Sequence, residues 1–533
     1  MPARLPVRLV AVLAAVAVAV GALAAGLIRA ARYHPPPVRP VAPAAGSAAA
    51  GPAGCAGVPA RAARELRGMW LTTVNNIDFP SRPGLSEQQV KAEYRGWLDL
   101  AAAQRHNAIF VHVRPSGDAF WPSRYAPWSE WLTGRRDGAG PGWDPMAFMV
   151  AEAHRRNLEF HAWFNPYRGS QPAPAGAGAD LAKLAPNHPL RQHPDWAVAY
   201  PKGPTGRLYF DPGNPAARRF VEDSILEAVR AYDIDGVHFD DFFYPYPEQG
   251  QDFPDGASYA RRAGRAQSRA DWRRANVDTF VREMSVRIKQ VKPWVKFGIS
   301  PFGIWRNAAT DPAGSRTSGL QSYDAIYADT RAWVRNQWLD YIVPQLYWAI
   351  GFARADYATL LAWWSALVRG TRVQLYVGQA DYRVGEPGPW RDPAQLSRQL
   401  ALNHRYGVTG SVHFSATQVR ADRLGAVTRY RNAHYAQPAL LPPMAQLPAH
   451  PPGRPLLVAP RSAPGGRIVF AWQPAAGAAP VAWALYRVAG RAAGLVATGR
   501  AGTALPAVPP GTYCLSTLDR SGNEGPLSAP LSR

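Results

Sequence analysis

The sequence predicts an α/β protein, a (β/α)8 TIM barrel followed by a small β-sandwich near the C-terminal end. Short β-branched or aromatic runs alternate with helix-like stretches from Leu66 to about Asn432, which is the pattern of repeated βα units. Eight such runs can be counted, the number that closes a barrel. No glycine-rich phosphate-binding motif follows the first run, and this disfavours an open, doubly wound sheet.

The elements of the predicted barrel follow one another in regular order. The expected strands are Gly68–Val74, Ala108–Arg114, Leu158–Asn165, Gly236–Asp240, Val295–Ser300, Tyr341–Leu346, Arg372–Val377 and Gly410–Phe414. The helix-like segments between them include Glu87–Gln104, Pro145–Arg156, Pro215–Tyr232 and Trp272–Val291. Because a barrel brings the carboxyl ends of its strands to one face, the residues that follow these strands are candidates for an active site.

Residues 1–28 have the form of a signal peptide or signal anchor. Arg4 and Arg8 precede an apolar run, Leu9–Ile28, that is rich in Ala, Val and Leu. Ala22-Leu23-Ala24 offers a cleavage site, whereas the uncleaved run is about long enough to cross a bilayer. We therefore expect an extracytoplasmic protein, located in the periplasm or cell envelope or secreted, and attached to the membrane if this segment stays uncleaved.

The remaining chain divides by composition. Residues 29–62, which contain Pro35-Pro36-Pro37, predict a flexible spacer, and residues 63–436 predict the barrel domain. Residues 437–464 form a Pro-rich linker, and residues 465–533 predict a fibronectin type III-like β-sandwich.

The small C-terminal domain carries no catalytic signature. Its expected strands are Arg467–Trp472, Val481–Val488, Gly494–Thr498, Gly511–Leu518 and Leu527–Leu531. Trp472 is expected to fill its core. Because no chemistry is predicted beyond the linker, we expect a chain that ends near Gln437 to fold.

The two cysteines leave two possibilities open. Cys55 follows Pro52-Ala53-Gly54, which resembles a lipoprotein acylation box but is separated from the apolar run by the spacer. The other cysteine is Cys514, and an oxidising compartment would permit a disulfide between the two.

The net charge of +22 is diffuse. Arginines are scattered through every segment, with one dense cluster from Arg261 to Arg274, and the excess of Arg, Ala, Pro and Gly is typical of a GC-rich genome. Such a field favours an anionic wall or polysaccharide, and we expect no nucleic-acid partner. We further expect a monomer with no cofactor.

Polar groups and large flat rings recur together at the predicted strand ends. Sugar binding needs this mixture, because aromatic faces pack on the C–H face of a pyranose while amides, Arg and carboxylates bond its hydroxyls. The expected substrate-binding residues are Arg114, His161, Trp163, Asn165, Arg168, His238, Trp305, Gln345, Tyr347 and Trp348.

Four strings resemble the glycosyl-hydrolase-like family 10 of bacterial proteins. They are Arg67–Trp70, His161–Arg168, Gly236–Pro245 and Pro344–Trp348, and the likeness extends roughly from Glu65 to Tyr430. The family includes envelope lipoproteins that cleave peptidoglycan glycan strands stripped of their stem peptides. The resemblance thus implies a barrel, an envelope location, and a glycoside hydrolase whose partner is a polysaccharide.

The catalytic groups are expected after the fourth strand. The segment Asp235–Asp240 is also similar to the chitinase signature, but Phe242 stands where that signature has its acidic Glu. Asp240 and Asp241 must then take over, with a second carboxylate from elsewhere. Asp118 is our preferred second carboxylate, and Asp381 and Glu130 are further candidates.

Strand alternation predicts how the two aspartates differ. His238 and Asp240 share one face, while the apolar Val237 and Phe239 share the other, so the first pair should point into the barrel. Asp240 should therefore be the more buried and cluster with His238. Asp241, nearer the mouth, is expected to perform the proton transfer or attack.

Two other functions remain open. A glycan-binding protein without catalysis is one, because Phe242 replaces an acid. A metal-dependent polysaccharide deacetylase is the other, since histidines fall within four strands: His112, His161, His238 and His413. No His-x-His or His-Glu-x-x-His spacing occurs, and the simpler interpretation is a polar barrel lining, so we expect no metal.

Overall fold

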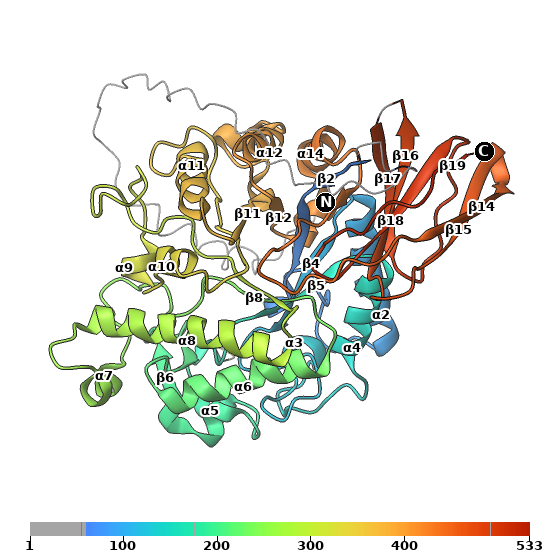
Figure 1. The fold of residues 1–533 in the computed structure, drawn as a ribbon. Coiled ribbons are helices and arrows are strands. Elements are labelled where there is room, and N and C mark those ends of the chain that lie inside the picture. Colours follow the sequence, from blue (N-terminus) through green and yellow to red (C-terminus); the bar gives the residue numbers. More distant parts are fainter. Residues whose placement is uncertain (1–54, 56–59, 174–175, 491, 533) are drawn as a thin grey trace, which may run out of the picture. The chain divides into compact units, whose positions relative to one another are not determined.

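Eight parallel strands close into a barrel in the computed structural model, in the order β10-β11-β12-β3-β4-β5-β8-β9 (Figure 1). The predicted fold class is confirmed. The strands are β3 (Leu66–Leu71), β4 (Ala108–Arg114), β5 (Glu159–Phe164), β8 (Gly236–Phe239), β9 (Lys296–Ile299), β10 (Tyr341–Ile342), β11 (Gln374–Gln379) and β12 (Gly410–His413). The first ends three residues earlier than expected, because Val74 already belongs to a 3₁₀ turn.

The structure describes residues 55, 60–173, 176–490 and 492–532. The predicted signal segment, residues 1–28, and most of the predicted spacer lie outside the described residues. Among the described residues, no helix is long and apolar enough to cross a membrane.

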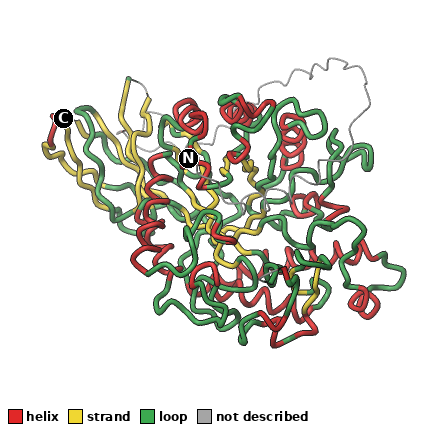
Figure 2. The backbone as a smooth tube through the Cα atoms, turned by 180° about the vertical axis from the view of Figure 1, so that it is seen from behind, coloured by secondary structure: helices red, strands yellow, loops and turns green. Residues whose placement is uncertain are grey.

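Helices surround the barrel, as Figure 2 shows from behind. The longer ones are α2 (Glu87–Ala103), α4 (Pro145–Arg155), α6 (Pro215–Ala231), α8 (Arg269–Val291), α11 (Tyr357–Val368), α12 (Gln395–Arg405) and α14 (Ala426–His434). The shorter ones are α3 (Glu130–Thr133), α5 (Pro189–Gln192), α7 (Gly256–Arg262), α9 (Ser322–Ala325), α10 (Thr330–Arg335) and α13 (Ala416–Ala421).

The starts of these helices follow from the sequence. Ser86 and Gln89 form a capping box at the start of α2, while Asp144 and Asn214 cap α4 and α6, each followed by a proline in the first turn. An inserted hairpin that the strand pattern did not predict, β6 (Ala197–Tyr200) and β7 (Arg207–Phe210), follows β5.

Two apolar layers hold the barrel. The outer layer packs strand side chains such as Val237 and Phe239 against the helices. The inner layer fills the barrel with residues that include Trp70, Phe110 and Tyr341. The barrel is thus a packed core whose chemistry is confined to one open end.

The segment after the last barrel helix closes the other end. β13 (Ala439–Leu440) pairs with β2 (Ala63–Arg64) just before the first barrel strand. Met444 and Leu447 are 1% and 4% exposed and pack in the inner layer. Part of the predicted linker therefore forms a plug under the barrel, and this gives a reason to revise our expectation that a chain ending at Gln437 folds.

We predict that a chain ending after Gln437 is much less stable than one ending after Pro452, which keeps the plug. Burying a Met or a Leu contributes about 1.5–3 kcal/mol, and two such losses are large against a typical stability of about 5–15 kcal/mol. Thermal unfolding of both truncated chains measures the difference. Equal melting temperatures would show that the plug contributes nothing.

The C-terminal region forms antiparallel sheets. Strands β17 (Ala492–Arg500), β16 (Ala482–Ala489), β18 (Thr512–Leu518) and β19 (Leu531–Ser532) form one sheet, to whose edge β1 (Ala60–Arg61) adds in parallel. β14 (Leu456–Ala463) pairs with β15 (Arg467–Gln473) and begins inside the predicted linker. Trp472 is only partly buried at the end of its strand, and Phe470 and Trp483 fill this core instead.

Covalent and ionic contacts join these sheets to the rest of the chain. Cys55 forms a disulfide with Cys514, with 6.4 Å between the Cα atoms, so Cys55 is bridged in the structure and has no free thiol. Arg520 contacts Asp233 at 2.7 Å and Asp235 at 3.5 Å on the loop before β8. The C-terminal sheets are therefore clamped to the barrel and to its leading segment.

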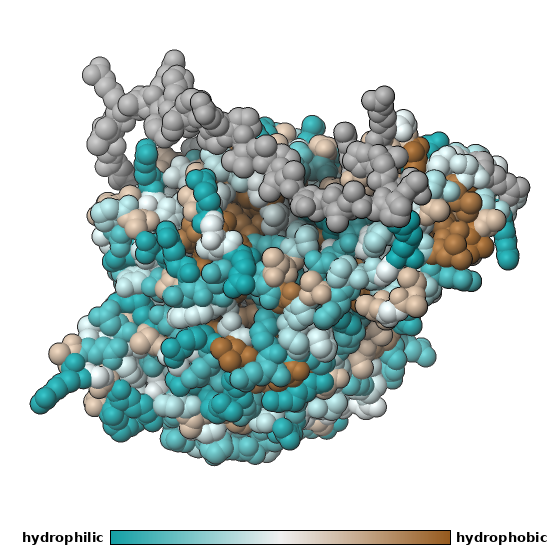
Figure 3. All heavy atoms as spheres, in the orientation of Figure 1, coloured by the Kyte–Doolittle hydropathy of each residue, from teal (hydrophilic) through white to brown (hydrophobic). Residues whose placement is uncertain are grey.

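Hydrophilic residues cover most of the visible surface, with separate hydrophobic patches (Figure 3). The large exposed hydrophobic side chains of the described residues are Ile77, Val286, Phe352, Leu424 and Leu456. They lie on different elements.

Candidate active site

Two aspartates stand at the end of β8, at the carboxyl face of the barrel. Asp240 and Asp241 directly follow Phe239, and each is 5% exposed. The alternation along β8 is as predicted, with Val237 and Phe239 in the outer layer. The expected difference in burial between the two carboxyl groups is wrong.

A hydrogen-bonded amide holds Asp240. Asn165, which follows β5, donates from Nδ2 to Asp240 at 2.5 Å, and the backbone N–H of Phe242 donates at 3.1 Å. His112 and Arg168 both donate to Oδ1 of Asn165, at 3.0 and 3.1 Å. These two donors fix the orientation of the amide, so its N–H group must point at Asp240.

Asp241 has different partners. The hydroxyl of Tyr246 donates to Oδ2 of Asp241, and the side chain of Gln345 donates to Oδ1 at 3.2 Å. The same Gln345 nitrogen also donates to the carbonyl of Ser300 at 2.9 Å, which anchors it. Asp241 therefore accepts two hydrogen bonds that favour its ionised form.

The electrostatics separate the two groups. Burial raises the pKa of Asp240 to about 7, and the neighbouring charge of Asp241 adds to this rise. Burial also raises the pKa of Asp241, but the hydrogen bonds from Tyr246 and Gln345 oppose the shift. Arg168, Asn165 and the backbone N–H of Phe242 oppose the rise at Asp240 as well, but the rise there is the larger, so a proton shared by the pair is favoured on Asp240.

Aromatic rings lie around the two carboxyl groups. Phe242 lies beneath Arg168, with the guanidinium carbon 4.2 Å from the ring centroid. Tyr347, whose pKa burial raises and the charges of both aspartates raise further, is half-buried. Trp348 is half-buried too and packs on Phe302 with ring centroids 5.5 Å apart. Half-buried rings beside carboxyl groups can stack on a sugar.

Phe242 therefore has a structural role in the site. Its ring supports Arg168, which bonds the same amide that orients Asp240. The phenylalanine is therefore part of the site.

Two predicted sugar-binding histidines lie within the barrel instead. His161 bonds Tyr341 at 2.8 Å and Glu159 at 3.0 Å. His238 bonds Tyr341 at 3.2 Å, Ser300 at 3.0 Å and the indole N–H of Trp70 at 3.2 Å. Because protein groups occupy all four ring nitrogens, these histidines cannot bond a sugar without losing a partner, and the expected cluster of His238 with Asp240 is not formed.

The predicted tryptophans are spread more widely. Trp163 stacks on His112 with ring centroids 3.9 Å apart, next to the amide that holds Asp240. Trp305 is buried, donates to Asp329 at 2.9 Å and stacks on Trp363. These partners are not among the residues that bond Asp240 or Asp241 in the described structure.

Arg114 and Asp118 lie on the β4 side of the barrel face. Arg114 donates to the carbonyl of Asn165 at 3.0 Å. Burial raises the pKa of Asp118, and the nearby charge of Arg114 only partly opposes this rise. Burial raises the pKa of Glu130, and the nearby charge of Asp118 adds to this rise, so these two carboxyl groups lie near each other. Asp381 bonds His413 at 2.9 Å. The three candidates for a second carboxylate therefore have partners other than Asp240 and Asp241.

The histidines do not converge on one point. His413 points away from the barrel interior toward Asp381 and Tyr435, while His112 bonds Asn165. Within the described part of the chain, no group of three or more His, Cys, Asp or Glu side chains could hold a metal ion.

Sequence reasoning missed Tyr246 and Ser300, and it named His112 only as a metal candidate or as polar barrel lining. Tyr246, Ser300 and His112 contact Asp241, Gln345 and Asn165 respectively. Their positions beside strand ends were visible in the sequence, since Tyr246 closely follows β8 and Ser300 follows β9. Their hydrogen-bond partners lie on other strands, which sequence spacing does not reveal.

Comparison with known proteins finds a matching family model and similar proteins. The family model described as Glycosyl hydrolase-like 10 matches residues 65–395. Glycosyl hydrolase YngK of Bacillus subtilis (strain 168) is 48% identical over 403 residues, which cover 75% of this chain and 77% of that protein. Glycosyl hydrolase DigH of Escherichia coli (strain K12) is 39% identical over 360 residues, which cover 64% of this chain and 81% of that protein. Both aspartates lie within the matched range.

Proposed function

Since the chain belongs to the glycosyl hydrolase-like 10 family and is a glycoside hydrolase, we propose that it cleaves an amino-sugar polysaccharide outside the cytoplasm, namely denuded peptidoglycan glycan. The unlike environments of Asp240 and Asp241 carry the proposal. Two neighbouring carboxyl groups whose pKa values are pushed apart are what glycoside hydrolysis requires, one as an acid and one as an anion.

In the proposed mechanism, Asp240 is the general acid. It donates its proton to the glycosidic oxygen as the bond to the leaving sugar breaks. Asp241, held as an anion by Tyr246 and Gln345, stabilises the positive charge that develops at the anomeric carbon or attacks it. A water molecule then supplies the hydroxyl that the anomeric carbon gains, directly or by hydrolysing the bond to Asp241. Strand alternation predicted either proton transfer or attack for Asp241; in this mechanism the proton transfer is assigned to Asp240, and the attack stays with Asp241.

The proposal of an amino-sugar substrate rests on the family resemblance and on the net charge of the protein. The net charge of +22 favours an anionic glycan, and half-buried Tyr347, on whose pKa the charges of both aspartates act, offers a ring near the carboxyl groups.

Incubating the protein with denuded glycan strands and separating the products by size tests the proposal. Shortened strands are expected. Unchanged strands would favour a glycan-binding protein without catalysis, and released acetate at constant length would favour a deacetylase.

We also propose that the chain is exported. The apolar run Leu9–Ile28 follows Arg4 and Arg8, and the disulfide between Cys55 and Cys514 is compatible with an oxidising compartment. We predict that alkaline phosphatase fused after residue Pro201 is active in cells, because that enzyme requires export. An inactive fusion, together with an active cytoplasmic reporter at the same position, would refute export.

A further inference from the structure

A second polar pocket lies over β4 and β5, on the same face of the barrel as the two aspartates. It has a volume of about 80 Å³, and loops after β4 and β5 form it, with Ser116, Asp118, Trp128, Gly169 and His188 in its wall. Of the described residues that line it, none is Asp240 or Asp241. The pocket is therefore separate from the catalytic pair.

The pocket and the catalytic pair share a wall. Gly169 directly follows Arg168, which bonds the amide of Asn165 at 3.1 Å. Arg114 donates to the carbonyl of Asn165 on one side, and its charge acts on Asp118 on the other. Neighbouring strands lie about 4.8 Å apart, so the ends of β4 and β8, two strands apart, are about 10 Å from each other. This is the scale of sugars two units apart in one extended glycan chain.

The floor of the pocket holds a buried polar group without a partner. Ser116 is 8% exposed, and its hydroxyl has no hydrogen-bond partner within the described structure. Asp118 is 6% exposed and accepts the backbone N–H of Ser116 at 2.7 Å, which leaves further acceptor capacity. Burial lowers the pKa of His188 to about 4, so its imidazole is neutral. A ligand hydroxyl, which both donates and accepts hydrogen bonds, could bond the Ser116 hydroxyl and the Asp118 carboxyl group.

One wall is apolar and the charges are balanced. Trp128 is half-buried and lines the pocket beside Pro127. The charged lining consists of three acids and three bases: Asp118, Glu130, Asp180, Arg135, Arg136 and Lys183. Glu130 pairs with Arg136 at 2.6 Å, which neutralises both. The pocket thus has an aromatic wall, polar groups that can bond hydroxyls, and no net charge. This combination fits a neutral pyranose better than an ion.

We propose that this pocket is a second saccharide subsite, which holds a neutral sugar of the same glycan chain whose bond is cleaved at Asp240 and Asp241. The inference rests on the proposed function, because it takes the glycan as the ligand. It implies that long strands are bound at two places, and that short fragments occupy the catalytic pair alone.

The test compares Trp128→Ala and Ser116→Ala with the wild-type protein on denuded glycan strands fractionated into short and long lengths. Losing a stacked ring costs about tenfold in binding, so kcat/KM on long strands should fall about tenfold for Trp128→Ala, while kcat/KM on short strands should not change. Ser116→Ala should show a smaller loss of the same kind. Trp338→Ala, a half-buried tryptophan just before β10, is the matched control and should act as wild type on both lengths.

Equal losses of Trp128→Ala on both lengths, or none on either, would overturn the subsite. If the wild-type protein cleaves neither fraction, the proposed function fails, and calorimetric binding of long strands to the wild-type and Trp128→Ala proteins then decides the pocket by itself. Weaker binding by Trp128→Ala would support the pocket, and equal binding would refute it.

Discussion

Replacing Asp240 with Asn is expected to lower the turnover of glycan strands by about 10²–10⁴-fold, the contribution typical of a general acid. Asn has nearly the same shape as Asp but cannot supply the proton. It removes no packing, so the affinity for glycan should change little, but its NH2 group must face either the Asn165 amide or the Phe242 N–H, both donors, so the melting temperature should fall modestly. Steady-state turnover, thermal unfolding and calorimetric binding measure the three quantities.

Asn165→Asp provides a related control on the same hydrogen bond. It replaces the amide donor that points at Asp240 with a third carboxyl group, so it should also lower turnover, although Asp240 itself is intact. Full turnover in Asp240→Asn would remove this residue from the acid role.

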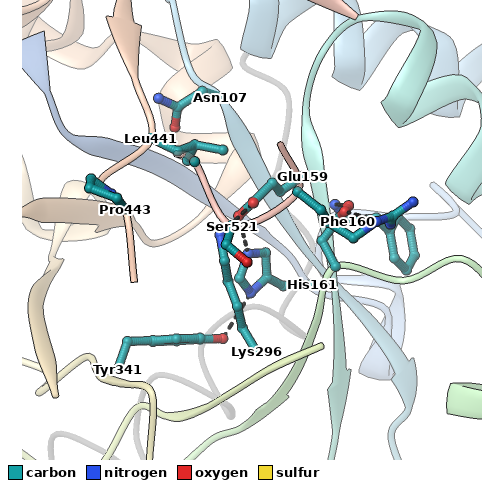
Figure 4. A network of polar contacts seen from close by, with 12 residues as sticks. Asn107, Glu159, Phe160, His161, Lys296, Tyr341, Leu441, Pro443 and Ser521 are labelled. Carbon is teal, nitrogen blue, oxygen red and sulfur yellow. Dashed lines mark hydrogen bonds and ion pairs between the residues drawn. The ribbon is translucent and has the colours of Figure 1, made fainter. Parts of the chain in front are cut away.

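The second prediction with a large expected effect concerns stability, and it comes from a series of polar contacts inside the barrel. Figure 4 shows contacts that run from Lys296 to Glu159, from Glu159 to His161 and from His161 to Tyr341. Lys296 is 2% exposed and forms an ion pair with Glu159. We predict that Lys296→Met lowers the free energy of unfolding by about 3–5 kcal/mol, because it leaves the Glu159 carboxylate buried beside His161 without its cation.

Denaturant and thermal unfolding measure this loss. Lys202→Met is the control, since Lys202 is exposed and should tolerate the change. The double variant Lys296→Met with Glu159→Leu should recover part of the stability, because it removes the stranded charge as well. An unchanged stability in Lys296→Met would mean that the ion pair is not needed inside the barrel.

The barrel could be predicted from the sequence because its signal is local and repeated. Runs such as Ala108–Arg114 show their strand character in a few residues, and caps such as Ser86 mark helix starts. The plug formed by Met444 and Leu447 was not predictable in this way. Its burial depends on contacts with strands distant in the chain, and its Pro-rich surroundings favour a linker.

The site was predicted in part for the same reason. Asp240, Asp241, Asn165 and Gln345 stand at strand ends and do come together. The roles of the two aspartates could not be derived, since they depend on the donors that each meets, and Tyr246 and Asn165 come from different parts of the barrel face. His161 and His238 were placed correctly on the inner face, but their depth along the strand, and hence their partners, was not visible.

The assignment of the proton to Asp240 is tested most directly by the pH dependence of kcat/KM for the wild-type protein and Asp241→Asn. A general acid must be protonated, so wild-type activity should fall as the pH rises through the pKa of Asp240, which is raised to about 7. Asp241→Asn removes the negative charge that helps to hold that proton, so its remaining activity should fall at a lower pH. An alkaline limb that stays in place or moves to higher pH in Asp241→Asn would contradict the assignment.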